Sequence, residues 1–178
     1  MRSTWGGSIL GRRLIRPICL AVPVLMICLL ALAGNGTVAL AAGLRGVVTT
    51  EQLYADSPEF RTNAEAYQPD QQSVAKIRAI DRKIKVVLFL GTWCYDSIHN
   101  APKLLKALDQ AANPNLSLEI IAVDRNKDDG GGLAEKFGLK RVPTVILLAD
   151  GKEVGRITER PTTTMEGDFA TIVGGKKK

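Results

Sequence analysis

The chain has 178 residues, 46% of them hydrophobic, with 24 lysines and arginines against 18 acids and a formal net charge of +6. This length suffices for one domain with a sizeable hydrophobic core, and no internal repeat or low-complexity segment indicates another class. Four of the arginines lie in residues 1–42, which contain no acid, so the remainder holds 20 basic and 18 acidic residues, a net charge of +2. The basic balance therefore does not indicate a nucleic-acid partner, and none is expected.

Residues 1–42 have the three-part layout of a secretory signal peptide: early arginines, an apolar run from Pro17 to Ala33, and small residues ending near Ala41. An uncleaved membrane anchor is the alternative, because the uncharged stretch from Pro17 to Leu44 is long enough to span a bilayer. Either way we expect the rest of the chain outside the cytoplasm, periplasmic or secreted, or anchored and facing the periplasm. This segment would be its only contact with a membrane.

Of the three cysteines, Cys19 and Cys28 lie in the apolar run, so the exported chain keeps Cys94 alone. Small secreted domains often use paired cysteines as staples, and none can form here. An unpaired cysteine in such a protein indicates a reactive or intermolecular thiol.

Residues 43–69 are polar with a few aromatics, and we expect an N-terminal extension that wraps the domain or stays partly loose. Asp70 is expected as the N-cap of a helix that has Val74, Ile77 and Ile80 on one face.

Beyond this helix, continuous apolar runs predict buried strands, and apolar residues at helical spacing predict helices between them. The expected elements are strands at 84–91 and 116–124, helices at 97–112 and 131–139, two strands joined by a turn at Asp150-Gly151, and a last helix from about Thr164. This order predicts an α/β fold with a mixed central sheet flanked by helices over residues 70–174, followed by a basic tail at 175–178.

The segment GTWCYDSIHN places Cys94 at a strand-to-helix junction. The free N–H groups and positive dipole of a helix start favour the thiolate, which is the nucleophilic form. Ser97, in the first turn of the helix, can donate its hydroxyl to the sulfur. The negative charge of Asp96 works against a thiolate, because it disfavours a second negative charge nearby. The segment therefore predicts a reactive thiol, with a packed and inert cysteine as the alternative.

Several separated motifs resemble the thioredoxin family. WCYDSIHNAP is similar to its active-site segment, with Cys94 at the nucleophile position and Pro102 in the following helix, and AEKFGLKRVPT is similar to the segment ending in its cis-proline, here Pro143. VDRN at 123–126 and ADGKEV at 149–154 match a strand end and a hairpin of the family. With Glu159-Arg160-Pro161, the WCYDS turn resembles an exported bacterial thioredoxin-like group with a Trp-Cys-x-Asp-Cys or -Ser turn.

The resemblance implies a thioredoxin fold over about residues 70–173 and the catalytic positions Cys94 and Ser97. It also implies that Val142-Pro143 is a cis bond beside the cysteine, where the backbone can pair with an extended peptide. The substrate-binding residues implied are Trp93, Tyr95, Val142, Pro143 and Thr144.

Two departures from the family limit the chemistry. Ser97 replaces the resolving cysteine, and Leu88 stands where the family has a buried acid. Without a second thiol the chain cannot complete a disulfide reduction by itself. His99, the only histidine, stands five residues after Cys94, and side chains at this spacing on a helix point in different directions. We therefore interpret His99 as a surface residue and expect no metal site.

These features predict a monothiol thioredoxin-like protein that exchanges disulfides through a CxxS turn, without a cofactor, and needs an external thiol for resolution. Its expected partners are thiol- or disulfide-bearing proteins or a glutathione-like thiol. The alternative is a non-redox module with this fold that binds peptides or proteins, so the sequence leaves thiol-disulfide oxidoreductase activity open.

Overall fold

The computed structural model describes residues 43–175. The expected signal peptide or anchor at 1–42 and the three lysines that end the basic tail lie outside the described residues. Within residues 43–175, none of the helices has the length and apolar character needed to cross a membrane.

A five-stranded sheet with the strand order β1-β3-β2-β4-β5 forms the centre of the domain. Its central strand β2 runs parallel to β3 and antiparallel to β4, and the edge strands β1 and β5 are both antiparallel to their neighbours. The strands are β1 (Gly46–Val48), β2 (Ile84–Leu90), β3 (Leu116–Ala122), β4 (Thr144–Ala149) and β5 (Lys152–Thr158). The mixed α/β architecture expected from the sequence is confirmed.

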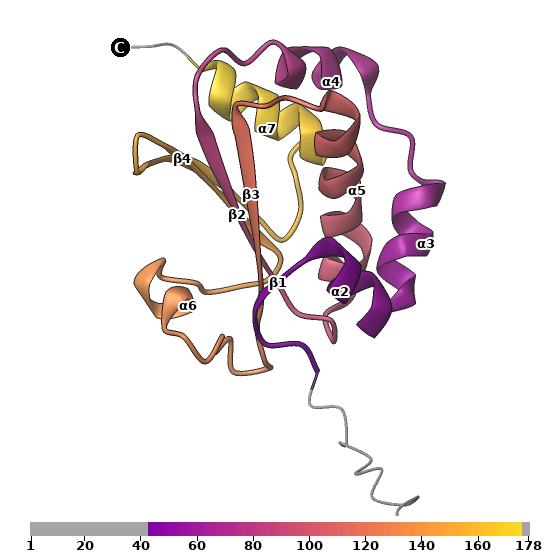
Figure 1. Ribbon diagram of the computed structural model, residues 1–178, viewed down its shortest axis with the longest axis vertical. Helices are drawn as coiled ribbons and strands as arrows, with labels where there is room; N and C mark the ends of the chain where they lie inside the picture. Colours follow the sequence, from indigo (N-terminus) through magenta and orange to yellow (C-terminus); the bar gives the residue numbers. More distant parts are fainter. Residues whose placement is uncertain (1–42, 176–178) are drawn as a thin grey trace, which may run out of the picture. The chain divides into compact units, whose positions relative to one another are not determined.

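Helices cover both faces of the sheet, which explains why the central strand is apolar throughout. Side chains alternate along a strand, so Val86, Leu88 and Leu90 pack in the larger core cluster, whereas Val87 and Phe89 pack in the smaller one. Figure 1 shows α6 on one side of the sheet and the other helices on the opposite side. The helices are α2 (Thr50–Asp56), α3 (Pro58–Ala66), α4 (Gln71–Arg78), α5 (Tyr95–Ala111), α6 (Leu133–Lys136) and α7 (Met165–Gly174).

The N-terminal extension is regular structure rather than loose chain. It supplies β1, which pairs with β3, and then α2 and α3. Thr49 and Gln52 form a reciprocal capping box at the start of α2, and Pro58 stands in the first turn of α3. Both are signals that the sequence carries and that our interpretation of it missed.

Local caps and a turn mark where several of the remaining elements begin or end, as expected from the sequence for Asp70 and for Asp150-Gly151. Asp70 caps α4 by accepting a hydrogen bond from the Ser73 N–H at 2.8 Å, and its hydrogen bonds with Ser73 hold the pKa of its carboxyl below the usual value. Asp150 and Gly151 both have positive φ, at 51° and 75°, as a tight hairpin between β4 and β5 requires. Thr164 caps α7 in the same way as Asp70 caps α4.

Candidate active site around Cys94

Cys94 is the N-cap residue of α5 and the only cysteine in residues 43–175. Its half-buried thiol donates a hydrogen bond to the carbonyl oxygen of Val142, with 3.3 Å between Sγ and the oxygen. The Val142–Pro143 peptide bond is cis. The expectation that this loop lies beside the thiol, with a cis bond, is therefore confirmed.

Trp93 is fixed against the end of the sheet. Its indole Nε1–H donates to the Val123 carbonyl at 3.0 Å, and the guanidinium of Arg125 lies 5.2 Å from the centre of its ring. Gly91 leaves the space that the ring occupies, because a Cβ there would stand only 2.6 Å from Trp93 Cε2. The GTWC segment thus holds the residue before the cysteine in one position.

Ser97 does not assist the sulfur in the way the sequence suggested. Its side chain is fully buried, and its hydroxyl accepts a hydrogen bond from the Gly91 N–H at 3.3 Å. Among the described residues, no hydrogen bond joins Ser97 to Cys94, so that expectation was wrong. The first turn of α5 directs this short side chain toward the end of β2, where the Gly91 N–H needs an acceptor.

Tyr95 and His99 form an aromatic pair on the exposed side of the same helix. Tyr95 is 68% exposed, and its ring stacks on the imidazole with 3.9 Å between the centres. His99 Nδ1 lies 2.9 Å from the Tyr95 carbonyl oxygen, one turn back along the helix. In residues 43–175, no group of three acidic, histidine or cysteine side chains is arranged to hold a metal ion.

The loop after β5 joins the thiol site to the cis-proline loop. The Glu159 N–H donates to the Pro143 carbonyl at 2.7 Å, and Asn100 of α5 donates to the Glu159 carbonyl at 3.1 Å. Arg160 forms an ion pair with Asp96, with 3.2 Å between Nε and Oδ1. The sequence interpretation used Glu159-Arg160-Pro161 only as a mark of resemblance and missed these contacts, two of which join residues more than fifty positions apart.

Most of the cis-proline loop is buried. Val142, Pro143 and Thr144 all have buried side chains, and the Thr144 hydroxyl donates to the Arg141 carbonyl at 2.7 Å. Such side chains offer little surface to a partner, so recognition at this loop would use the backbone. Of the expected substrate-binding residues, the exposed one is Tyr95, with Trp93 half-buried beside it.

Leu88, at the position of the family's buried acid, is fully buried in the middle of β2. It faces Ile120 of β3 and Val145 of β4, and it packs in the larger core cluster. The sheet beneath the helix start is therefore apolar, and Leu88 offers no proton donor or acceptor to the site.

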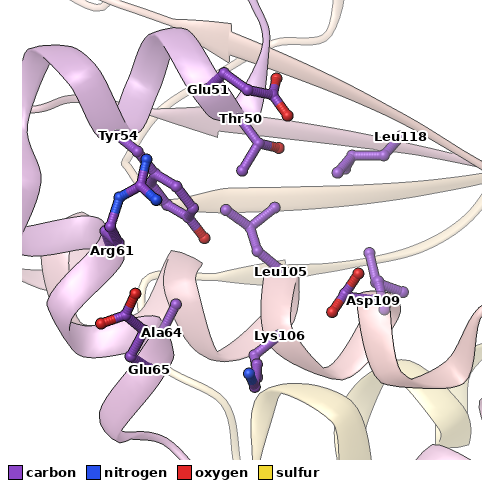
Figure 2. A pocket seen from close by; sticks show the side chains of 11 residues that line it. Thr50, Glu51, Tyr54, Arg61, Ala64, Glu65, Leu105, Lys106, Asp109 and Leu118 are labelled. Carbon is purple, nitrogen blue, oxygen red and sulfur yellow. The ribbon is translucent and has the colours of Figure 1, made fainter.

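A separate hollow of about 430 Å³ lies where α2, α3, α5 and β3 meet (Figure 2). Figure 2 shows the side chains of Arg61 and Tyr54 together at its wall, and the guanidinium carbon lies 5.1 Å from the ring centre. None of the residues around Cys94 lines this hollow, so it does not belong to the thiol site.

A thioredoxin family model matches residues 48–170, which includes most of the N-terminal extension. Among solved structures, a protein of unknown function from Pseudomonas aeruginosa is 26% identical, covering 71% of this chain and 74% of its own, with a TM-score of 0.46. The germline-specific thioredoxin Deadhead of Drosophila melanogaster is 16% identical over 56% of this chain and 86% of its own, with a TM-score of 0.40. A search of curated proteins found no match. Because the family model covers well over half of its residues, the chain belongs to the thioredoxin family.

Proposed function

We propose that the protein is a monothiol exchanger of disulfides that works outside the cytoplasm. The position of the Cys94 thiol carries this proposal: it is half-buried at the start of α5 and 3.3 Å from the carbonyl that precedes cis-Pro143. An incoming disulfide can reach such a sulfur while its own backbone lies along the loop. The location rests on the signal-like layout of residues 1–42.

The exchange needs two displacements on sulfur. The Cys94 thiolate, its proton released to water, attacks one sulfur of a disulfide, so that a mixed disulfide forms and the other sulfur leaves as a thiolate. An external thiolate then attacks the mixed disulfide at the substrate sulfur and releases Cys94. The net reaction converts one disulfide and one thiol into another disulfide and another thiol, and Cys94 ends unchanged.

Ser97 explains why the second thiol must be external. It occupies the position of the resolving cysteine, and an alcohol does not displace a thiolate from a mixed disulfide as a thiolate does. The mixed disulfide of Cys94 should therefore accumulate until another thiol arrives, whether from a protein or from a glutathione-like compound.

The test is adduct formation followed by restoration of the missing group. With glutathione disulfide, the wild-type protein should gain one glutathione on Cys94 by mass spectrometry, and it should give almost no insulin reduction with dithiothreitol. Ser97→Cys should give insulin reduction, because it supplies a resolving thiol. A Cys94 that forms no adduct and alkylates no faster than a free cysteine at neutral pH would contradict the proposal.

One observation favours a second candidate, a non-redox binding module. The Cys94 thiol donates to the Val142 carbonyl, and a thiolate could not make this hydrogen bond. In that case the exposed Tyr95–His99 pair and the loop backbone would bind an extended peptide without covalent chemistry. Cys94→Ser separates the two candidates, because it abolishes exchange but should leave peptide binding intact.

A further inference from the structure

Two arginines from distant parts of the chain lie next to the residues on either side of Cys94 in the sequence. Arg125, from the segment after β3, lies over the ring of Trp93, which precedes the cysteine. Arg160, from the segment after β5, pairs with Asp96, two residues beyond the cysteine. Nothing in the local sequence of the cysteine turn places positive charge there.

Both arginines have donors that the described residues leave unused. Arg160 contacts Asp96 through Nε at 3.2 Å, its side chain is 74% exposed, and its two Nη groups donate to no other described residue. Arg125 is exposed and takes part in none of the ion pairs found in residues 43–175. Each guanidinium can therefore donate hydrogen bonds to a further carboxylate.

The acids of the site already have hydrogen-bonding partners. Asp96 pairs with Arg160, and the Glu159 carboxylate lies 2.7 Å from Arg141, whose pKa it raises by this hydrogen bond. Asp124, next to Arg125 in the chain, accepts hydrogen bonds from backbone N–H groups of its own loop. The three acids and the three arginines Arg125, Arg141 and Arg160 therefore balance in charge, and Arg125 is the arginine among them that forms no ion pair in the described residues.

We infer that Arg125 and Arg160 make Cys94 selective for disulfides that carry a carboxylate near the sulfur. This inference rests on the proposed function and names the substrate class of the same site. An arginine donates two parallel hydrogen bonds to a carboxylate and repels an ammonium group. A substrate with carboxylates on both sides of its disulfide could meet one arginine with each half.

Three small disulfides with the same two-carbon spacing test the selectivity: dithiodipropionate (anionic), cystamine (cationic) and hydroxyethyl disulfide (neutral). Each reacts by the same exchange, forming a disulfide to Cys94 and releasing one small thiol. A peptide spanning Trp93–Ser97 is the reference, because it keeps Cys94 and Asp96 without the two arginines. The ratio of the rate with the anionic disulfide to that with the cationic one should be more than tenfold higher in the full-length protein than in the peptide.

At an ionic strength of about 10 mM, Arg125→Gln and Arg160→Gln should each lower this ratio about fourfold, the effect of one charge taken as roughly 8 Å from the probe in a water-like dielectric and acting oppositely on the two probes. Arg160→Lys should keep most of the ratio, because it keeps the charge. Arg61→Gln is the matched control, since Arg61 also lies over an aromatic ring, that of Tyr54 in Figure 2, and none of the residues around Cys94 lines its hollow.

The outcomes separate this inference from the proposed function. If hydroxyethyl disulfide reacts with Cys94 but the ratio equals that of the peptide, or both arginine variants leave it unchanged, the selectivity is refuted and the exchange function stands. If Arg61→Gln lowers the ratio as much, net charge rather than these two arginines explains it, and the inference is again wrong. If none of the three disulfides reacts with folded protein, both proposals fail.

Discussion

The packing of Trp93 on Gly91 gives the sharpest test of how the cysteine is positioned. In Gly91→Ala, the new Cβ would lie 2.6 to 2.9 Å from three atoms of the indole ring. Ordinary contacts between carbon atoms are about 3.5 to 4.0 Å, so the ring has to move by about 1 Å. The ring is rigid and tied to the Val123 carbonyl at 3.0 Å, so this movement stretches or breaks that hydrogen bond.

We expect Gly91→Ala to lower the free energy of unfolding by about 2 to 4 kcal/mol, combining overpacking of about 1 to 3 kcal/mol with one hydrogen bond of about 1 kcal/mol. Urea unfolding measures this value. Trp93 is the only tryptophan once the expected signal peptide is removed, so its fluorescence reports the site; where the N-terminal segment is retained, Trp5→Phe removes the other tryptophan. The shifted ring should also change the alkylation rate of the adjacent Cys94.

Gly174→Ala is the control, because a Cβ there meets no atom within 4 Å. Its effect should stay within about 0.5 kcal/mol. In a Trp93→Ala background the clash is absent, and Gly91→Ala should then cost less than about 1 kcal/mol. If Gly91→Ala costs less than about 0.5 kcal/mol in the protein that keeps Trp93, and the fluorescence is unchanged, then the packing of Trp93 on Gly91 does not position the ring.

Three further predictions follow from buried polar and apolar groups. Leu88→Asp places a carboxyl in the core and should lower the free energy of unfolding by about 3 kcal/mol or more at pH 7. Because burial raises the pKa of such an acid in the folded state, the loss relative to wild type should shrink toward pH 4. An equal loss at pH 4 and pH 7, measured by urea unfolding of both proteins, would contradict this. Burial alone would raise the pKa of Asp129, but backbone N–H donors including that of Ala134 outweigh it and lower the pKa. Asp129 therefore stabilises the fold above about pH 4, and this contribution is lost as the pH falls through its lowered pKa in the folded state. Asp129→Asn should make the free energy of unfolding fall less steeply between about pH 4 and lower pH. An unchanged slope in this range would contradict the prediction. Tyr67→Phe removes the 2.9 Å hydrogen bond to fully buried Glu166 and should cost about 1.5 to 3 kcal/mol in thermal or urea unfolding, so a neutral effect would show that this bond adds nothing.

The elements from Asp70 onward could be predicted because their signals are local. Apolar runs and helical spacing depend on a few neighbouring residues, and the Asp70 cap and the Asp150-Gly151 turn act within three or four positions. The cis bond at Pro143 came from the resemblance of the segment and not from local physics. For the extension before Asp70 the sequence analysis expects only a segment that wraps the domain or stays partly loose, although the Thr49–Gln52 capping box is a local signal of a helix start.

The element order from Asp70 onward, the single thiol at a helix start and the serine at position 97 in place of a resolving cysteine all follow from the order of residues alone. The hydrogen bond of the Ser97 hydroxyl with Gly91 rather than with the sulfur, and the positions of Arg125 beside Trp93 and of Arg160 beside Asp96, depend on how the chain packs. The two groups of features differ in the range of the interactions that produce them. Periodicity and caps act over one or two turns, whereas the partners of Cys94, Trp93 and Asp96 lie 30 to 64 positions away and meet them only when strands and helices pack.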